Sequence, residues 1–300
     1  MANLRIDFYQ DTPSELRQVA EQSIATLIQR REEVAAKARA AETEVANLTN
    51  ALNAPLRNLI ASDPEAAAAL EQLNTRSIIH AHETGLLLSD PVLAATDNAV
   101  GFARVHGQSP LTLAFGPPYN FSWSWHAGGP PFNQMIDPRT GRVGLDARSG
   151  SVTGGFAGSV AAHVGFGVFL STDHPTHRTA GGVVLPSDYV YHLRTVGIAS
   201  ATADGGWECT ALENGQLIAS SSFQWWRKRI SNGENSDGAD TNTAGYSVPN
   251  TTTGLTFAVQ PGRAYTFNVG LWVSSDRSFR AGAAAAQSLG EGNVTRIGAS

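Results

Sequence analysis

The sequence predicts an α+β protein of modular design, in which a long N-terminal helix or helical hairpin of the coiled-coil type precedes an antiparallel β-sandwich of the jelly-roll kind. Three observations predict this fold class. Apolar residues recur every three or four positions in a glycine-free stretch over residues 12–62, apolar and polar residues alternate in stretches after about residue 97, and no helical pattern separates those later stretches. We therefore expect a helical stalk or oligomerisation region over residues 1–90 and a sandwich head over residues 91–300.

The first helix has a clear beginning in the sequence. Thr12 offers a hydroxyl at the N-cap, Pro13 stands at the first helical position, and Glu15 follows three residues after the cap, so that backbone N–H groups at the helix start are satisfied. A heptad seam then runs along the helix through Ile24, Leu27, Arg31, Val34, Ala38, Ala41, Val45, Leu48 and Leu52. A single helix cannot bury so narrow a seam against itself, so the seam predicts a partner helix.

A second helix is indicated by the sequence Ser-Asp-Pro-Glu at residues 62–65, and we expect it to end near His82, before Gly85. The two helices could fold back as an antiparallel hairpin within one chain. Alternatively, the long helix could join copies from other chains in a parallel bundle. The composition of the seam leaves both arrangements open, and we expect the protein to be a homo-oligomer.

The later part of the chain has the period of two that is typical of strands with one wet face. Eight to ten antiparallel strands are expected, including residues 119–126, 142–147, 152–170, 189–200, 217–230 and 264–273. Many residues on the odd-numbered face of residues 151–171 are glycine, alanine, serine or threonine, and His163 lies on the same face. This face should therefore allow another sheet, a helix or a neighbouring subunit to approach closely.

The stretch FQWWRKRISNGENSDG, at residues 223–238, is the main candidate for binding. Alternation along a strand would place Trp226 outward or at an interface, next to a cluster of cations, and such an aromatic ring can stack on a base or a sugar ring. The candidate binding residues are Trp226, Arg227, Lys228 and Arg229, followed by Trp123 or Trp125 if one of them is exposed. We expect a non-enzymatic structural or adhesion protein, with a head that binds a protein or glycan partner.

Two other functions stay open at this stage. A pore-forming protein could insert residues 151–200 or its helices into a membrane, because an alternating pattern rich in small residues is also typical of inserting hairpins. A metal-dependent enzyme could use His174 and His177 if a third ligand came from elsewhere. The acidic residues 231–242 do not fit an EF-hand loop, and we expect a solvated hairpin loop there. No catalytic residue, cofactor or metal is expected under the main interpretation.

Composition excludes some classes of partner. The formal charge of −5 and the pI of about 5.9 argue against general binding to nucleic acids. Cys209 is the single cysteine, and we expect it to be buried in a strand. The N-terminus lacks a cationic segment followed by an apolar run. We therefore expect no cleavable signal peptide, and either a cytoplasmic protein or one exported by a signal-less route.

Overall fold

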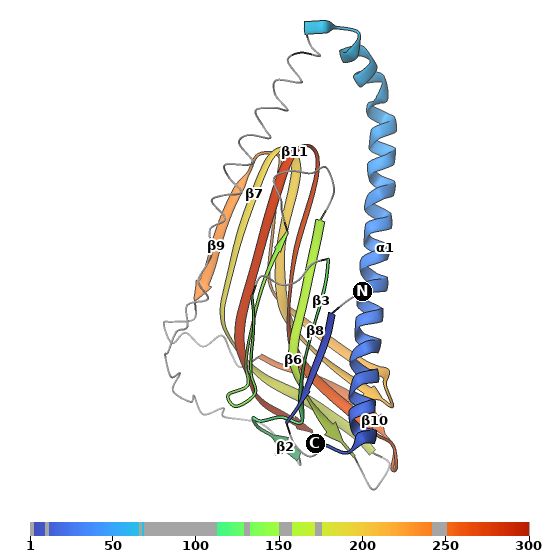
Figure 1. The fold of residues 1–300 in the computed structure, drawn as a ribbon, viewed down its shortest axis with the longest axis vertical. Helices are drawn as coiled ribbons and strands as arrows, with labels where there is room; N and C mark the ends of the chain where they lie inside the picture. Colours follow the sequence, from blue (N-terminus) through green and yellow to red (C-terminus); the bar gives the residue numbers. More distant parts are fainter. Residues whose placement is uncertain are drawn as a thin grey trace.

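The computed structural model describes residues 3–9, 12–65, 68, 113–128, 133–149, 158–171, 176–241 and 251–299. The elements in these residues are mainly strands, and every pairing between them is antiparallel. In chain order (Figure 1), they are β1 (Asn3–Phe8), α1 (Ser14–Ala61), β2 (Leu113–Phe115), β3 (Phe121–Ala127), β4 (Asn133–Asp137), β5 (Arg142–Ser149), β6 (Gly158–Leu170), β7 (Thr176–Glu213), β8 (Gln216–Ser231), β9 (Asn235–Thr241), β10 (Thr251–Val259) and β11 (Tyr265–Ala299).

The two longest strands, β7 and β11, pair along most of their length and fold over together. A straight strand would separate Leu271 from Gly290 by about 60 Å, at roughly 3.3 Å per residue. Yet a Cβ placed on Gly290 would lie 3.4 Å from a methyl carbon of Leu271. The fold-over lies midway between these residues, where the pairing register shifts between Phe279 and Ala281. This bend turns one continuous antiparallel ribbon into two layers.

We call the two layers sheet I and sheet II. Sheet I has the strand order β1-β3-β6-β11-β7-β8 and uses residues 265–279 of β11 and 199–213 of β7. Sheet II has the order β4-β5-β11-β7 and uses residues 281–299 of β11 and 176–198 of β7. In sheet II, β9 and β10 pair with the outer edge of β7, and β2 pairs with the end of β11.

The main hydrophobic core lies between the two sheets. It joins buried residues of β5, such as Leu145, to buried residues of β6 and β11, such as Phe166 and Phe267. A hydrogen bond also joins the two sheets: Ser275 Oγ of sheet I donates to the carbonyl oxygen of Ala147 in sheet II at 2.8 Å. The protein is therefore a β-sandwich, and the antiparallel sandwich predicted for the later strands is confirmed.

Helix α1 packs on the outer face of sheet I, and it extends beyond the strands at the top of Figure 1. Its buried residues Ala20, Ile24, Leu27 and Ile28 lie at helical spacing, so they form one apolar stripe. This stripe covers an aromatic strip formed by alternate residues of β3, namely Phe121, Trp123 and Trp125. The helix begins at Ser14, within one residue of the predicted first position, and the amide of Arg17 donates to the carbonyl of Pro13 at 3.0 Å.

The glycines of β6 make room for the aromatic strip. Gly167 pairs directly with Phe121, and a Cβ on Gly167 would lie 2.1 Å from the ring of Phe121. The small residues predicted to permit a close approach therefore accept aromatic rings from the neighbouring strand of the same sheet. Larger side chains at these positions would displace the rings that support α1.

The predicted modular fold class is wrong in its helical part. Apart from a helical start at Pro64, Glu65 and Ala68, α1 is the one helix in the described residues, and the buried part of its predicted seam, at Ile24 and Leu27, lies on sheet I. No helical hairpin or coiled coil occurs in the part of the chain that the structure describes. The apolar spacing could not decide this, because a stripe at three- and four-residue steps fits the apolar face of a sheet as well as another helix.

Several sequence predictions concern residues outside the described ones. These include the course of the second helix after its start at Pro64, the domain boundary near residue 90, and the side chains of Arg31 and of the later seam residues. Cys209 is buried in β7, as predicted. No helix among the described residues is long and apolar enough to span a membrane.

Candidate functional site

The β7–β8 hairpin positions one end of α1. Asn214 and Gly215 both have positive φ, 47° and 80°, as a two-residue hairpin turn between twisted strands requires. Thr26 Oγ1 donates to the carbonyl oxygen of Gly215 at 2.7 Å. Deeper in the interface, Thr266 Oγ1 of β11 donates to Ser23 Oγ at 2.9 Å. These bonds fix the rotation and height of the helix on sheet I, which its apolar stripe alone would leave less defined.

Two register shifts in β8 decide which side chains of this strand face α1. One shift lies opposite Ala211 and Leu212, and the other lies opposite Gly205 and Gly206. Between them the pairing is regular, so Ser220 stands opposite Thr210 and Ser222 stands opposite Glu208. Residues that are directly opposite share a face of the sheet. The result is a row of hydroxyl groups and a carboxylate beside the helix.

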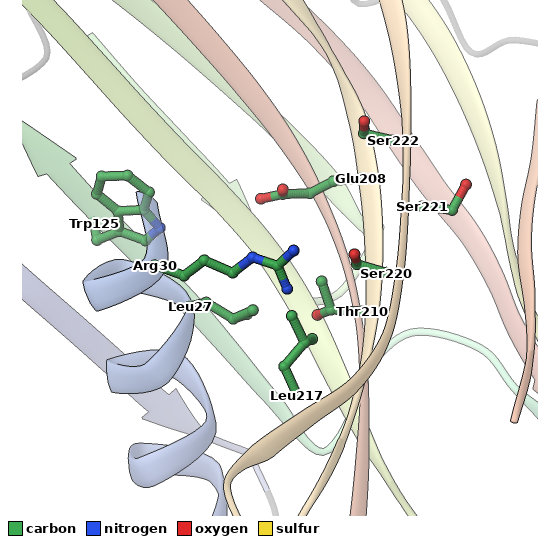
Figure 2. Close-up of a pocket in the computed structure, with 9 residues that line it drawn as sticks. All are labelled: Leu27, Arg30, Trp125, Glu208, Thr210, Leu217, Ser220, Ser221 and Ser222. Atoms are coloured by element: carbon green, nitrogen blue, oxygen red, sulfur yellow. The ribbon is translucent and has the colours of Figure 1, made fainter. Parts of the chain in front are cut away.

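A groove of about 250 Å³ opens between α1 and this row. Its lining residues are Leu27, Arg30, Trp125, Glu208, Thr210, Leu217, Ser220, Ser221 and Ser222. Figure 2 shows the Arg30 side chain extending from α1 across the groove, with its guanidinium between Glu208 and Thr210. Ser221 points away from Arg30 and Glu208 in the same view, so the hydroxyls that face the helix are those of Thr210, Ser220 and Ser222.

Glu208 is held in place by His163 of β6. The Nδ1 atom of His163 lies 2.7 Å from Oε1 of Glu208, and a carboxylate at this position accepts a hydrogen bond from the imidazole N–H. Both residues are buried, and Trp125 stacks on the imidazole with ring centroids 4.2 Å apart and planes 13° apart. The ring is thus held on one face by the indole and at Nδ1 by the carboxylate. This arrangement orients Glu208 toward the groove.

The groove combines one exposed cation, one buried carboxylate and the three hydroxyls that face the helix, next to the apolar side chains of Leu27 and Leu217. Hydroxyl groups both donate and accept hydrogen bonds, a carboxylate accepts them, and a guanidinium donates them. These groups can therefore bind and orient a small polar molecule.

The residues predicted to bind lie away from this groove, apart from Trp125. Trp226 is 5% exposed, and Trp123 and Trp125 are 1% and 3% exposed. Arg227, Lys228 and Arg229 are exposed. Of the two positions expected for Trp226, the outward one is wrong, because this side chain is buried, and all three predicted tryptophans are largely buried. Whether the exposed cations bind a partner stays a prediction.

A β-bulge explains the error at Trp226. Trp226 pairs with Gly205 and Gln224 pairs with Gly206, which leaves Trp225 as an extra residue in β8. The bulge breaks the alternation of the strand. Trp225 and Trp226 therefore both contact Tyr189 of β7, and the ring of Trp226 lies parallel to that of Tyr189, with centroids 5.1 Å apart.

The acidic stretch after β8 is partly a strand. Residues 235–241 form β9 on the edge of sheet II, so the solvated hairpin loop predicted for residues 231–242 is too long. Asp237 accepts hydrogen bonds from Arg194 through both carboxylate oxygens and lies 3.0 Å from Nδ1 of His192. The residues that the structure describes contain no group of three or more potential metal ligands. His174 and the ring of His177 lie outside them.

The sequence interpretation missed the residues that form the groove, which are Arg30, Glu208, Ser220 and Ser222. Asn214-Gly215 is a strong hairpin signal, and two strands paired around it would have placed Glu208 beside the serines. Nothing in the pattern of the helix distinguishes Arg30 from its other exposed charged residues.

Comparisons with known proteins give little further information. No protein-family model matches the chain, and no curated protein matches it. One solved structure with some likeness is the enzymatically active domain of tailspike protein 4 from bacteriophage CBA120. It is 12% identical, with a TM-score of 0.19, and the match covers 61% of this chain and 18% of the tailspike chain. A likeness this weak carries no argument about fold or function.

Proposed function

We propose that the protein is a non-enzymatic binding protein whose β-sandwich holds a small polar ligand in the groove beside α1. The observation that carries this proposal is the row formed by Glu208, Thr210, Ser220 and Ser222, which faces Arg30 across the groove. Binding sites combine a concave, partly apolar surface with a few convergent polar groups. Leu27, Leu217 and Trp125 supply the apolar part.

The burial of His163 supports binding rather than catalysis. A general base has to reach the proton that it removes, whereas the imidazole of His163 is 3% exposed and lies against Trp125. Its contact with Glu208 gives it a role in positioning that carboxylate. Adhesion to a partner and assembly into a homo-oligomer stay predictions that the groove does not address.

The proposal can be tested by filling the groove. Ser222 is exposed and lies in the hydroxyl row, so Ser222→Trp should occupy the groove with an indole while the strand remains paired. Gln216→Trp is the matched control, because Gln216 is exposed at the start of the same strand and does not line the groove. Neutral sugars, sugar acids, amino sugars and amino acids would be screened by thermal shift and titration calorimetry.

We expect at least one of these compounds to stabilise the unmodified protein and the Gln216→Trp variant, but not the Ser222→Trp variant. At a ligand concentration 100 times the Kd, the stabilisation is about 2.7 kcal/mol, which corresponds to a rise in Tm of roughly 5 °C for a chain of this size. Equal stabilisation of all three proteins would place the ligand elsewhere. No stabilisation by any compound would contradict the proposal.

A further inference from the structure

We infer that the ligand of the groove is a hydroxyl-rich carboxylic acid of about the size of one sugar ring, with its carboxylate on Arg30 and its hydroxyls on the row formed by Glu208 and the serines. This inference rests on the proposed function, and it adds the chemical class of the ligand and its orientation.

Arg30 selects the acidic group. It is exposed on α1, and its guanidinium reaches into the groove rather than along the helix. A planar guanidinium matches a carboxylate through two parallel hydrogen bonds, so it recognises a flat anion with defined geometry. In the part of the chain that the structure describes, Arg30 is the one positively charged residue that lines the groove.

Glu208 selects the hydroxyl groups and sets the direction of the ligand. Its carboxylate accepts hydrogen bonds from ligand hydroxyls and repels a ligand anion, so the acidic group of the ligand is directed to Arg30. Ser220, Ser222 and Thr210 add hydroxyls that can both donate and accept. His163 keeps the carboxylate of Glu208 in position through the 2.7 Å contact.

The shape of the groove limits the size of the ligand. Its volume of about 250 Å³ is below the range of roughly 300 to 1,000 Å³ that is usual for sites that take drug-sized molecules. An extended glycan usually needs an open aromatic face for stacking, whereas Trp125 is 3% exposed and lies against His163. A phosphate group is disfavoured, because its two negative charges would face Glu208 with a single guanidinium to balance them. A single acidic sugar fits these limits.

Three sugars with the same ring but different charge provide the test: glucuronate, glucose and glucosamine. Calorimetric titration of the unmodified protein at low salt should give an affinity for glucuronate at least tenfold higher than for glucose, and glucosamine should not exceed glucose. In the Arg30→Gln variant the preference for glucuronate over glucose should fall below threefold, while Arg30→Lys should be intermediate. Arg229→Gln is the matched control, because Arg229 is exposed and does not line the groove, and it should keep the full preference.

The outcomes separate the inference from the proposed function. If glucose or glucosamine binds as tightly as glucuronate and Ser222→Trp abolishes that binding, the inferred ligand class is wrong and the binding groove stands. If Arg30→Gln keeps the tenfold preference, the assignment of Arg30 is wrong. If none of the three sugars, and no compound of the wider screen, binds in a way that Ser222→Trp blocks, both the inference and the proposed function fail. Each variant is first compared with the unmodified protein in Tm, so that a folding defect is not taken for a loss of binding.

Discussion

The outer faces of the two sheets have opposite chemistry, although both belong to the same ribbon of β7 and β11. On sheet I, the outer face carries the aromatic strip of β3 and is covered by α1. On sheet II, the outer face carries a polar row in which Arg148, Gln287, His192 and Asp237 stand directly opposite one another across four strands. Alternation along a strand therefore defines two faces, but it does not show what each face packs against.

The polar row of sheet II is held together by hydrogen bonds within the sheet. Asp146 is fully buried, and it accepts hydrogen bonds from Gln287 at 2.9 and 3.1 Å and from Arg148 at 3.0 Å. Burial raises the pKa of Asp146, and the nearby Arg148 only partly offsets this effect. Sheet I is thus stabilised on its outer face mainly by apolar packing, and sheet II mainly by directional polar contacts. The two faces should respond differently to substitution, pH and salt.

The largest effect should come from a cavity between α1 and sheet I. Ile24 is 0% exposed and lies in the cluster that contains Trp123 and Trp125. Ile24→Ala should lower the free energy of unfolding by about 3 kcal/mol, through lost apolar contact and the cavity that remains. Leu4→Ala is the matched control, because Leu4 is 40% exposed, and it should cost about 0.5 kcal/mol or less. Urea denaturation measures both, and equal losses would show that α1 contributes little to the stability of the sandwich.

A smaller effect, which depends on pH, is expected at Asp204 on the outer face of sheet I. Burial raises the pKa of its carboxyl to about 6, with a further contribution from the nearby Asp276. The folded state therefore takes up this proton at a higher pH than the unfolded state. The stability from this group is complete below pH 4 and is lost as the pH rises from about 4 to 6.

Asp204→Asn removes this dependence. The variant should be more stable than the unmodified protein by about 2 to 3 kcal/mol at pH 8, because a shift of one pKa unit corresponds to about 1.4 kcal/mol. At pH 4 the two proteins should have nearly equal stability. Urea denaturation at the two pH values checks this, since the effects of titrating groups that do not interact with Asp204 cancel between the proteins. A variant that is less stable at pH 8 would show that the ionised carboxylate is needed for its contacts.

The sequence was sufficient to predict the parts of this structure that depend on local patterns. The start of α1 close to Pro13 and the burial of Cys209 follow from short-range chemistry, and the alternation of the later stretches indicates antiparallel strands. The partner of α1 could not be predicted, because the aromatic strip that it covers comes from β3, about a hundred residues further along the chain. Periodicity describes one surface and says nothing about the second surface that meets it.

The candidate site was harder to predict than the fold. Glu208 and His163 meet because β6 and β7 both pair with β11, and Ser222 joins them because β8 follows a tight turn. Each of these residues is unremarkable within its own strand. The bulge at Trp225, which turns Trp226 into the core, also leaves no clear mark in the sequence. Sites that depend on pairing between distant strands, and on irregularities in that pairing, need a structure.

The smallest effect should come from the ion pair of Asp237 and Arg194 at the edge of sheet II. Hydrogen bonds from Arg194, and then from His192, hold the pKa of Asp237 below its usual range. The pH dependence of stability is therefore opposite to that of Asp204. The contribution of Asp237 is present above about pH 4 and is lost as the pH falls below that value. The Asp237 side chain is 49% exposed, so solvent screens the pair.

Arg194→Met tests this pair, because it keeps much of the packing of the stem while removing the charge. It should cost about 0.5 to 1 kcal/mol at pH 7 and low salt, and less in 1 M salt, as is typical of exposed ion pairs. Arg263→Met is a matched control, because Arg263 pairs with Glu213 at the other end of the sandwich, away from the polar row. If the loss at Arg194 exceeds 2 kcal/mol and is insensitive to salt, the polar row acts as a cooperative network rather than as separate pairs. The outer faces of the two sheets would then differ in cooperativity, because the polar contacts of sheet II would depend on one another.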